Sequence, residues 1–187
     1  TQGMLWGGST LLFVLGLVAM VLTIRNYRAA KIEEWLKAGQ AALGAELQGD
    51  PHTERLGEIV VVTSDPRARS VAESFGAVTV DDHDPPQGMN AAVTLGIEAL
   101  DAHAALVLVS DLPLISSADV DNLIAAAPDV DGVVLARSLD GTGTNAMLLA
   151  PPTALVPELG PGSLALHLSQ ASARGVAAQV VDHPGIA

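Results

Sequence analysis

The chain has 187 residues, which suits one ordinary domain, and it contains no cysteine, which excludes disulfides and thiolate metal sites. Its formal net charge of −12 lies entirely in residues 56–187, which carry sixteen acidic residues, four arginines and no lysine. This balance argues against nucleic acid as a partner, since a nucleic-acid backbone needs clustered lysine and arginine. It leaves a nucleotide open, because a divalent cation can bridge acidic side chains to phosphates.

The first element in the chain is an uncharged apolar run over residues 4–24. As a helix these residues would rise about 31 Å, roughly the thickness of one bilayer core. Basic residues follow the run and none precedes it, so the positive-inside rule places the rest of the chain in the cytoplasm. A signal peptide is disfavoured, because the charged leading region and a small-x-small cleavage site are both lacking. We therefore expect a transmembrane helix over residues 1–25 that anchors a cytoplasmic domain to the inner or plasma membrane.

Residues 26–55 are expected to connect this anchor to the body of the protein. A loose apolar stripe along residues 26–48, with charged side chains on its other side, predicts a helix. Gly-Asp-Pro at 49–51 breaks the helix and begins a linker. A juxtamembrane spacer is the simpler interpretation of this segment, and a partner-binding helix is the alternative.

The body of the chain, residues 56–187, alternates apolar runs with helical patterns. The apolar runs predict strands at 58–63, 77–80, 105–109, 132–136, 145–149 and 176–181. Turn or capping residues open the expected helices, which begin near Pro66, Asn90, Ser116 or Ser117, and Ser163. Strands separated by helices of this length indicate βαβ units, so we expect an α/β domain with a mostly parallel sheet.

The central apolar run, residues 105–109, ends abruptly in Ser110-Asp111. Open α/β sheets bind ligands at the carboxyl ends of their strands. An acid at this position is therefore well placed to hold a metal ion against a phosphate. The alternative is that Asp111 only caps the following turn.

Three loops contain groups that could bind an anion or a nucleotide. The Asp-Gly-Thr-Gly-Thr run at 140–144 offers hydroxyls and a close backbone approach, although such a run is more often a hairpin turn. Gly160 to Ser163 lead into a helix, whose positive end attracts anions; a plain N-cap is the alternative for Ser163. The junction at 87–90 could contact a base or ribose. The five histidines are interpreted as surface or packing residues, although His167, one turn after Ser163, could face the same pocket.

Together these segments resemble one family, the 2-phospho-L-lactate guanylyltransferases, whose actinobacterial members act as phosphoenolpyruvate guanylyltransferases. The motifs stand in the family's order and spacing: Ile-Val-Val-Val-Thr-Ser-Asp (59–65), Gly-Met-Asn-Ala-Ala (88–92), Ser-Asp-Leu-Pro-Leu (110–114), Asp-Gly-Thr-Gly-Thr-Asn-Ala (140–146) and Gly-Pro-Gly-Ser-Leu-Ala-Leu-His (160–167). The resemblance covers residues 56–187. It implies a glycosyltransferase-A-like, Rossmann-like nucleotidyltransferase fold, which is a three-layer α/β sandwich. It also implies transfer of GMP from GTP to phosphoenolpyruvate or 2-phospho-L-lactate, with release of pyrophosphate, in biosynthesis of the deazaflavin coenzyme F-420.

The resemblance implies roles for single residues as well. Asp111 would be the catalytic residue, because it would bind the Mg²⁺ that bridges the triphosphate. The phosphate and carboxylate of the acceptor would contact Thr144, Gly160 and Ser163. The nucleotide would contact Asp65, Gly88 and Asn90.

Two segments of the family have no recognisable counterpart here. The family opens on a strand with an Ile-Pro-x-Lys-like segment and a downstream Ala-Lys-x-Arg-Leu, where this chain has the apolar run and the helix at 26–48. It also continues past the His-Pro-Gly-Ile-Ala that ends this chain into an Asp-Val-Asp-Thr-Pro segment. We therefore expect an incomplete sheet that lacks its central first strand. Its exposed edges would invite a partner chain or self-association.

Two classes of function follow from these observations. The first is a guanylyltransferase, with low turnover expected for the isolated chain because the basic segments of the family are absent. The second is a membrane-tethered, catalytically inactive nucleotidyltransferase-like domain that binds a partner or ligand. A related nucleotidyltransferase with another acceptor, such as molybdopterin, is a further alternative.

Overall fold

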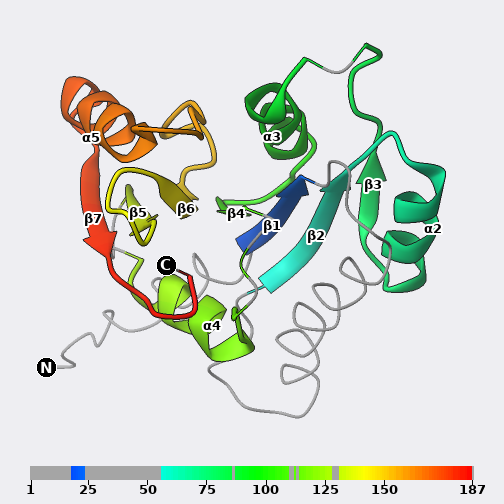
Figure 1. Ribbon diagram of the computed structural model, residues 1–187, viewed down its shortest axis with the longest axis horizontal. Helices are drawn as coiled ribbons and strands as arrows, with labels where there is room; N and C mark the ends of the chain where they lie inside the picture. Colours follow the sequence, from blue (N-terminus) through cyan, green and yellow to red (C-terminus); the bar gives the residue numbers. More distant parts are fainter. Residues whose placement is uncertain are drawn as a thin grey trace, which may run out of the picture.

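A computed structural model of the chain describes residues 18–23, 56–85, 87–109, 112, 114–127 and 131–186 (Figure 1). Its strands form one seven-stranded sheet in the order β3-β2-β1-β4-β6-β5-β7. The strands are β1 (Val18–Thr23), β2 (Leu56–Val62), β3 (Val78–Val80), β4 (Ala104–Leu108), β5 (Gly132–Arg137), β6 (Thr144–Ala150) and β7 (Ala177–Val181). The helices in this part of the chain are α2 (Pro66–Ser74), α3 (Met89–Glu98), α4 (Ser117–Ala125) and α5 (Ser163–Arg174).

Most of the sheet is parallel. β1 pairs in parallel with β2 on one side and with β4 on the other, and β2 pairs in parallel with β3. β6 runs antiparallel to both β4 and β5, and β7 is parallel to β5. Within the described sheet β6 is therefore the single reversed strand, and the prediction of a mostly parallel sheet is confirmed.

Helices cover both faces of the sheet, because successive side chains of a strand point to opposite faces. On β4, Leu106 and Leu108 belong to a core that includes residues of α2 and α4, whereas Ala105 and Val107 belong to a core that includes residues of α3 and α5. All five residues of β4 are buried. Burial on both faces explains why the sequence of this strand is continuously apolar rather than alternating. The domain is the expected three-layer sandwich of helices, sheet and helices.

The largest disagreement with the sequence prediction concerns β1. Val18–Thr23 lie within the apolar run that predicts a membrane helix, yet they form the strand between β2 and β4, with Val21 opposite both Val60 and Val107. A central parallel strand and a membrane helix share one hydropathy pattern, because both are apolar on every side. Over these six residues the helix prediction is wrong. Among the residues that the structure describes, no helix combines the length and apolar character needed to cross a bilayer.

The expected gap at the centre of the sheet is filled by this strand. β1 is paired along both of its edges, so the prediction of a sheet without its central first strand is also wrong. The expected exposure of apolar strand edges at that position disappears with it. The rest of the run at 4–24 and the predicted helix and linker over 26–55 lie outside the described residues.

Candidate functional site

Parallel pairing brings the carboxyl ends of β1, β2, β3 and β4 to one edge of the sheet. The segments that follow β2 and β3 contain the carboxylates of Asp65, Asp81 and Asp82. The reversed strand β6 begins at the same edge, because the amide of Val109, directly after β4, donates to the carbonyl of Asn145 (3.0 Å). Ligands of open α/β sheets bind at such an edge, which is therefore the candidate functional site.

Asp111, the predicted metal ligand, lies outside the described residues. Val109, the last described residue before it, is bonded to Asn145, and Asn145 is the neighbour of Thr144 in β6. The end of β4 and the start of β6 therefore lie side by side, as the prediction of a shared site for Asp111 and Thr144 requires. The metal-binding role of Asp111 stays a prediction.

Thr144 and Ser163, two predicted acceptor-binding residues, are in direct contact. The amide of Thr144 donates to the hydroxyl oxygen of Ser163 (2.8 Å), and both residues are buried, with 4% and 0% of their surfaces exposed. The amide of Leu164 donates to the carbonyl of Thr142 (3.1 Å), which joins the first turn of α5 to the loop before β6. The structure thus brings these two hydroxyls together, while their contact with an acceptor stays a prediction.

His167 completes this cluster from the next turn of α5. Its ring is fully buried, with Nδ1 at 3.0 Å from the hydroxyl oxygen of Thr144, and Nε2 accepts a hydrogen bond from the amide of Glu158 (3.0 Å). Because a backbone amide can only donate, Nε2 has no proton and Nδ1 carries it. Burial lowers the pKa of His167 below its usual value, against an opposing effect of the Glu158 carboxylate. The ring is therefore neutral at pH 7 and donates to Thr144.

The glycine-rich run forms the hairpin turn between β5 and β6. The Asp140 carboxylate accepts hydrogen bonds from the Ser138 hydroxyl (2.6 Å) and from the amide and hydroxyl of Thr142 (3.0 Å each). These bonds lower the pKa of Asp140 to about 2. The amide of Gly143 donates to the Ser138 hydroxyl (2.7 Å), and that of Thr144 to α5. Three successive amides are therefore used within the protein, so the run is a hairpin rather than an amide cradle for a phosphate.

The loop of residues 157–162, directly before α5, is held by Asn90 of α3. The side-chain amide of Asn90 accepts a hydrogen bond from the amide of Leu159 (2.8 Å) and donates one to its carbonyl (3.2 Å). Gly160 follows with a φ of +135°, a value that side chains other than glycine rarely adopt. Asn90 therefore fixes the loop that carries Gly160, and its predicted contact with a nucleotide stays a prediction.

Asp65 and Gly88, the other predicted nucleotide contacts, both stand at helix starts. Asp65 caps α2, because its Oδ1 accepts a hydrogen bond from the amide of Arg67 (2.8 Å), and its side chain is exposed. Gly88 precedes α3 with a φ of +110°, a conformation that favours glycine. Both residues follow parallel strands at the candidate edge, which is compatible with their predicted role and does not test it.

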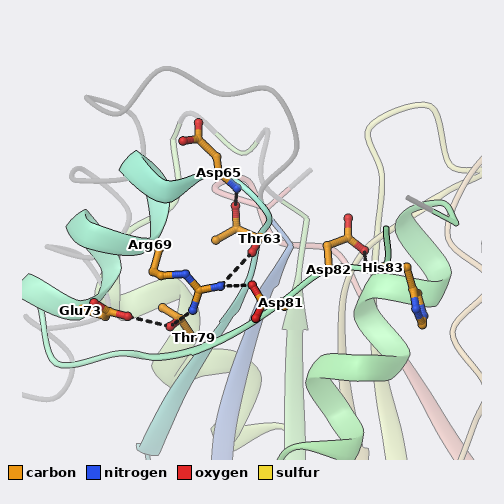
Figure 2. Close-up of polar contacts among 8 residues, drawn as sticks. All are labelled: Thr63, Asp65, Arg69, Glu73, Thr79, Asp81, Asp82 and His83. Atoms are coloured by element: carbon orange, nitrogen blue, oxygen red, sulfur yellow. Dashed lines mark hydrogen bonds and ion pairs between the residues drawn. The ribbon is translucent and has the colours of Figure 1, made fainter. Parts of the chain in front are cut away.

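Arg69, which no sequence motif singled out, ties two strand ends together (Figure 2). Its guanidinium donates to the hydroxyl of Thr79 (2.7 Å) and pairs with the carboxylate of Asp81, just after β3. It also reaches the carbonyl of Thr63, just after β2 (3.5 Å). Glu73 accepts a hydrogen bond from the same Thr79 hydroxyl (2.9 Å). This network fixes the loops after β2 and β3 relative to each other.

The described side chains at this edge offer few ligands for Mg²⁺. Within the described residues no three acidic or histidine side chains gather closely enough to hold a metal ion by themselves. Mg²⁺ does not need such a cage, because one or two carboxylates, waters and the phosphates of a nucleotide suffice. At this edge Asp65 and Asp81 are both exposed, and Asp81 pairs with Arg69. The residues fit an ion held mainly by phosphate oxygens and few carboxylates, with Asp111 as the predicted ligand.

The last described residues, 182–186, run from β7 alongside α4 (Figure 1). Ile186 is fully buried in the core shared with α4, and its carbonyl accepts a hydrogen bond from the Asn145 side chain (2.7 Å). His183 Nδ1 lies 2.6 Å from Asp119 Oδ1. The other oxygen of Asp119 accepts hydrogen bonds from the amide and the hydroxyl of Ser116 (2.6 Å each). Ser116 is the N-cap residue of α4. This tail therefore ties the start of β6 to α4.

Replacing Gly185 by alanine is expected to lower the free energy of unfolding by about 1–3 kcal/mol, the usual cost of overpacking. A Cβ at this position would overlap Asp119 Oδ2, so the Asp119 carboxylate has to leave the cap of α4. Denaturant titration measures the loss. In an Asp119→Ala background the obstacle is absent, and the added Gly185→Ala change should cost close to nothing. An equal cost in both backgrounds would contradict the clash.

Three residues that organise this edge were not predicted from the sequence: Arg69, Asn145 and Asp119. Arg69 acts on Asp81, twelve positions away, and Asn145 on Ile186, 41 positions away. Separations of this kind leave no signal in a single sequence. Of the three, only Asp119 has a signal in the sequence, because Ser116 and Asp119 have the spacing of a capping box.

Known proteins and one family model match most of the chain. The family model described as "MobA-like NTP transferase domain" matches residues 50–184. A phosphoenolpyruvate guanylyltransferase of Conexibacter woesei is 32% identical over 180 residues, which cover 89% of this chain and 80% of that protein. The phosphoenolpyruvate guanylyltransferase of Rubrobacter xylanophilus is 39% identical, and the match covers 71% of this chain and 65% of that protein. The one of Sphaerobacter thermophilus is 36% identical, and the match covers 69% of this chain and 62% of that protein. The first match extends to residues before 56, beyond the motifs recognised in the sequence.

Solved structures share the architecture at low identity. Glucosyl-3-phosphoglycerate synthase of Mycobacterium tuberculosis, in complex with Mn²⁺, UDP and glucosyl-3-phosphoglycerate, superposes with a TM-score of 0.67 at 16% identity, over 97% of this chain and 76% of that chain. 4-Diphosphocytidyl-2C-methyl-D-erythritol synthase of Anaerococcus prevotii gives 0.65 at 11% identity, over 95% and 91%. At these identities the likeness shows the fold alone, which is the expected nucleotidyltransferase and glycosyltransferase-A-like α/β sandwich.

Proposed function

Since the chain belongs to the MobA-like NTP transferase domain family and is a homologue of phosphoenolpyruvate guanylyltransferases, we propose that it transfers GMP from GTP to phosphoenolpyruvate and releases pyrophosphate. The three relatives compared above all carry the phosphoenolpyruvate name, which supports this acceptor over 2-phospho-L-lactate. GTP as the donor and a place in coenzyme F-420 biosynthesis belong to the same proposal, because the sequence motifs imply them.

In the proposed reaction a phosphate oxygen of phosphoenolpyruvate attacks the α-phosphorus of GTP in line. The bond between the α-phosphorus and the oxygen that bridges to the β-phosphate breaks, and pyrophosphate leaves with that electron pair. The protein contributes placement and neutralisation of charge rather than covalent chemistry. Mg²⁺ would supply neutralisation of the triphosphate, with Asp111 as its proposed ligand.

The strand order is the observation that carries this proposal. β4, which leads to Asp111, lies between the β1, β2 and β3 side of the sheet and β6. The proposed nucleotide contacts Asp65 and Gly88 follow β2 and β3, whereas Thr144 opens β6 beside Ser163. A residue at the end of β4 therefore lies between the proposed nucleotide side and the proposed acceptor side of one edge. A transfer between two bound phosphates needs that arrangement.

The position of β1 adds a second line of support. Arg25, Arg28 and Lys31 follow Thr23, the last residue of β1, within eight positions. Because β1 is parallel to β2 and β4, its carboxyl end faces the candidate edge. In our proposal these basic residues neutralise the triphosphate instead of flanking a membrane. One reason to expect low turnover, the absence of the family's basic segment, then falls away.

The proposal is tested by pyrophosphate release from the purified chain with GTP, Mg²⁺ and phosphoenolpyruvate. Release is expected only when all three are present, together with a guanylylated phosphoenolpyruvate detected by mass spectrometry. ATP in place of GTP, and 2-phospho-L-lactate in place of phosphoenolpyruvate, identify the donor and the acceptor. Faster turnover with phospholactate, or none with either acceptor, would contradict the proposal.

A further inference from the structure

We propose that His167 is a positioning residue, which fixes the Thr144 hydroxyl as a hydrogen-bond donor to an anionic oxygen of the acceptor acid. The inference rests on the proposed function, because it assigns the donor and acceptor roles in the hydrogen bonds of the same proposed acceptor-binding residues.

The direction of each hydrogen bond in this cluster follows from one backbone amide. The amide of Glu158 donates to His167 Nε2, so the single proton of the neutral ring is on Nδ1. Nδ1 lies 3.0 Å from the Thr144 hydroxyl oxygen, which must therefore accept. The hydroxyl proton of Thr144 cannot point to His167 and is left for another acceptor.

Ser163 is placed under the same constraint. Its hydroxyl oxygen accepts the amide proton of Thr144 (2.8 Å), so the Ser163 hydroxyl proton is also directed elsewhere. Within the described part of the chain no hydrogen bond uses either hydroxyl proton, although Thr144 and Ser163 are 4% and 0% exposed. Two adjacent donors with unused protons suit an oxyanion, and a phosphate or carboxylate of a small acid presents one.

Both ring nitrogens of His167 are hydrogen-bonded, as buried polar atoms usually are, so the bonds alone do not separate a structural role from a positioning role. What favours positioning is that the two bonds connect two segments of the proposed acceptor site. Nε2 holds Glu158 in the loop of residues 157–162, which also carries Gly160, and Nδ1 holds the first residue of β6. A protonated ring would lose the bond from Glu158, because two N–H groups would then face each other. The bond from Glu158 therefore requires a neutral His167.

Two variants separate the two halves of this arrangement. In His167→Asn the side-chain amide nitrogen can replace Nδ1 as the donor to Thr144, whereas in His167→Gln the side-chain oxygen can replace Nε2 as the acceptor from Glu158. We expect His167→Gln to raise the KM for phosphoenolpyruvate about tenfold or more, the effect of a misdirected hydrogen bond to a charged group. His167→Asn keeps the donor to Thr144 and loses only the neutral bond from Glu158, so it should raise this KM by a smaller factor, about threefold. The KM for GTP should change in neither variant.

Coupling to Thr144 provides the second readout. If His167 acts through Thr144, then His167→Gln should have no further effect on the KM for phosphoenolpyruvate in a Thr144→Val background. Equal effects of the asparagine and glutamine variants, or additive effects of His167→Gln and Thr144→Val, would overturn the inference. Melting temperatures of all variants show whether a change follows loss of the fold, which would lower the active fraction and therefore the apparent kcat, without a selective rise in the KM for phosphoenolpyruvate.

Failure of the proposed function is distinguished by direct binding. If the wild type releases no pyrophosphate, calorimetric titration with phosphoenolpyruvate decides the inference alone. Binding to the wild type and to His167→Asn, together with about tenfold weaker binding to His167→Gln, supports it. Equal binding to the three proteins, or no binding to the wild type, overturns it.

Discussion

Replacing Val21 by proline is expected to destroy the stable fold of this protein. Val21 lies in the middle of β1, opposite Val60 of β2 and Val107 of β4. A strand that is paired on both sides needs all of its backbone amides, and proline removes one amide and displaces the neighbouring strand. The cost is about 3 kcal/mol or more, a large share of the roughly 5–15 kcal/mol by which domains are stable. Circular dichroism and denaturant unfolding of the soluble protein measure it.

Val21→Ala is the matched control, because it shortens the side chain and leaves the amide in place. It should retain the fold with a smaller loss of stability. The same pair separates the two interpretations of the apolar run, since a membrane helix tolerates proline. A Val21→Pro protein that folds as the wild type does, and that partitions with membranes, would show that β1 is assigned to the wrong residues.

Replacing Asp111 by asparagine is expected to lower turnover about a thousandfold. The change removes the charge with which Asp111 is proposed to hold Mg²⁺ against the triphosphate, while the shape of the side chain is nearly kept. Metal neutralisation contributes several kcal/mol to such a transfer, and about 4 kcal/mol corresponds to a thousandfold in rate. Pyrophosphate release measures the rate, and titration of GTP binding against Mg²⁺ measures the metal dependence, which should disappear.

Asp101→Asn is the control for this substitution. Asp101 is exposed and precedes β4, at the end of the strand away from the candidate edge, and the chemical change is identical. This variant should turn over as the wild type does. Retained Mg²⁺-dependent GTP binding in Asp111→Asn would show that another residue holds the metal, and an equal loss in both variants would point to net charge instead.

The sequence contains enough information for most of the sheet and its helices. Apolar runs such as 105–109 and 132–136 are short, rich in valine and bounded by turn residues. They can therefore be recognised as strands from the local sequence, without knowledge of the strands that pair with them. The capping residues before α2 and α4 likewise mark helix starts. β1 was misread because its apolar residues continue into further apolar residues, and nothing local separates a long membrane helix from a short buried strand.

The site was predicted in outline and not in its bonds. The family resemblance implied one acceptor site for Thr144 and Ser163, and the structure brings the two residues into contact, while their role stays a prediction. The resemblance did not show that Asn90 bonds to Leu159, or that His167 joins Thr144 to Glu158. These contacts join segments far apart in the chain, so they depend on the tertiary fold rather than on local sequence.

The bond pair between Asn90 and Leu159 has a consequence for how this protein opens. It links the start of α3 to a loop 69 positions later, through both hydrogen-bonding groups of one side chain. Outward movement of the loop breaks both of these hydrogen bonds, so we expect opening of the loop and fraying of the start of α3 to be coupled. The rate of amide hydrogen exchange at Leu159 should then change together with the rates at the start of α3. A molecule that enters or leaves near Gly160 would alter exchange in both segments.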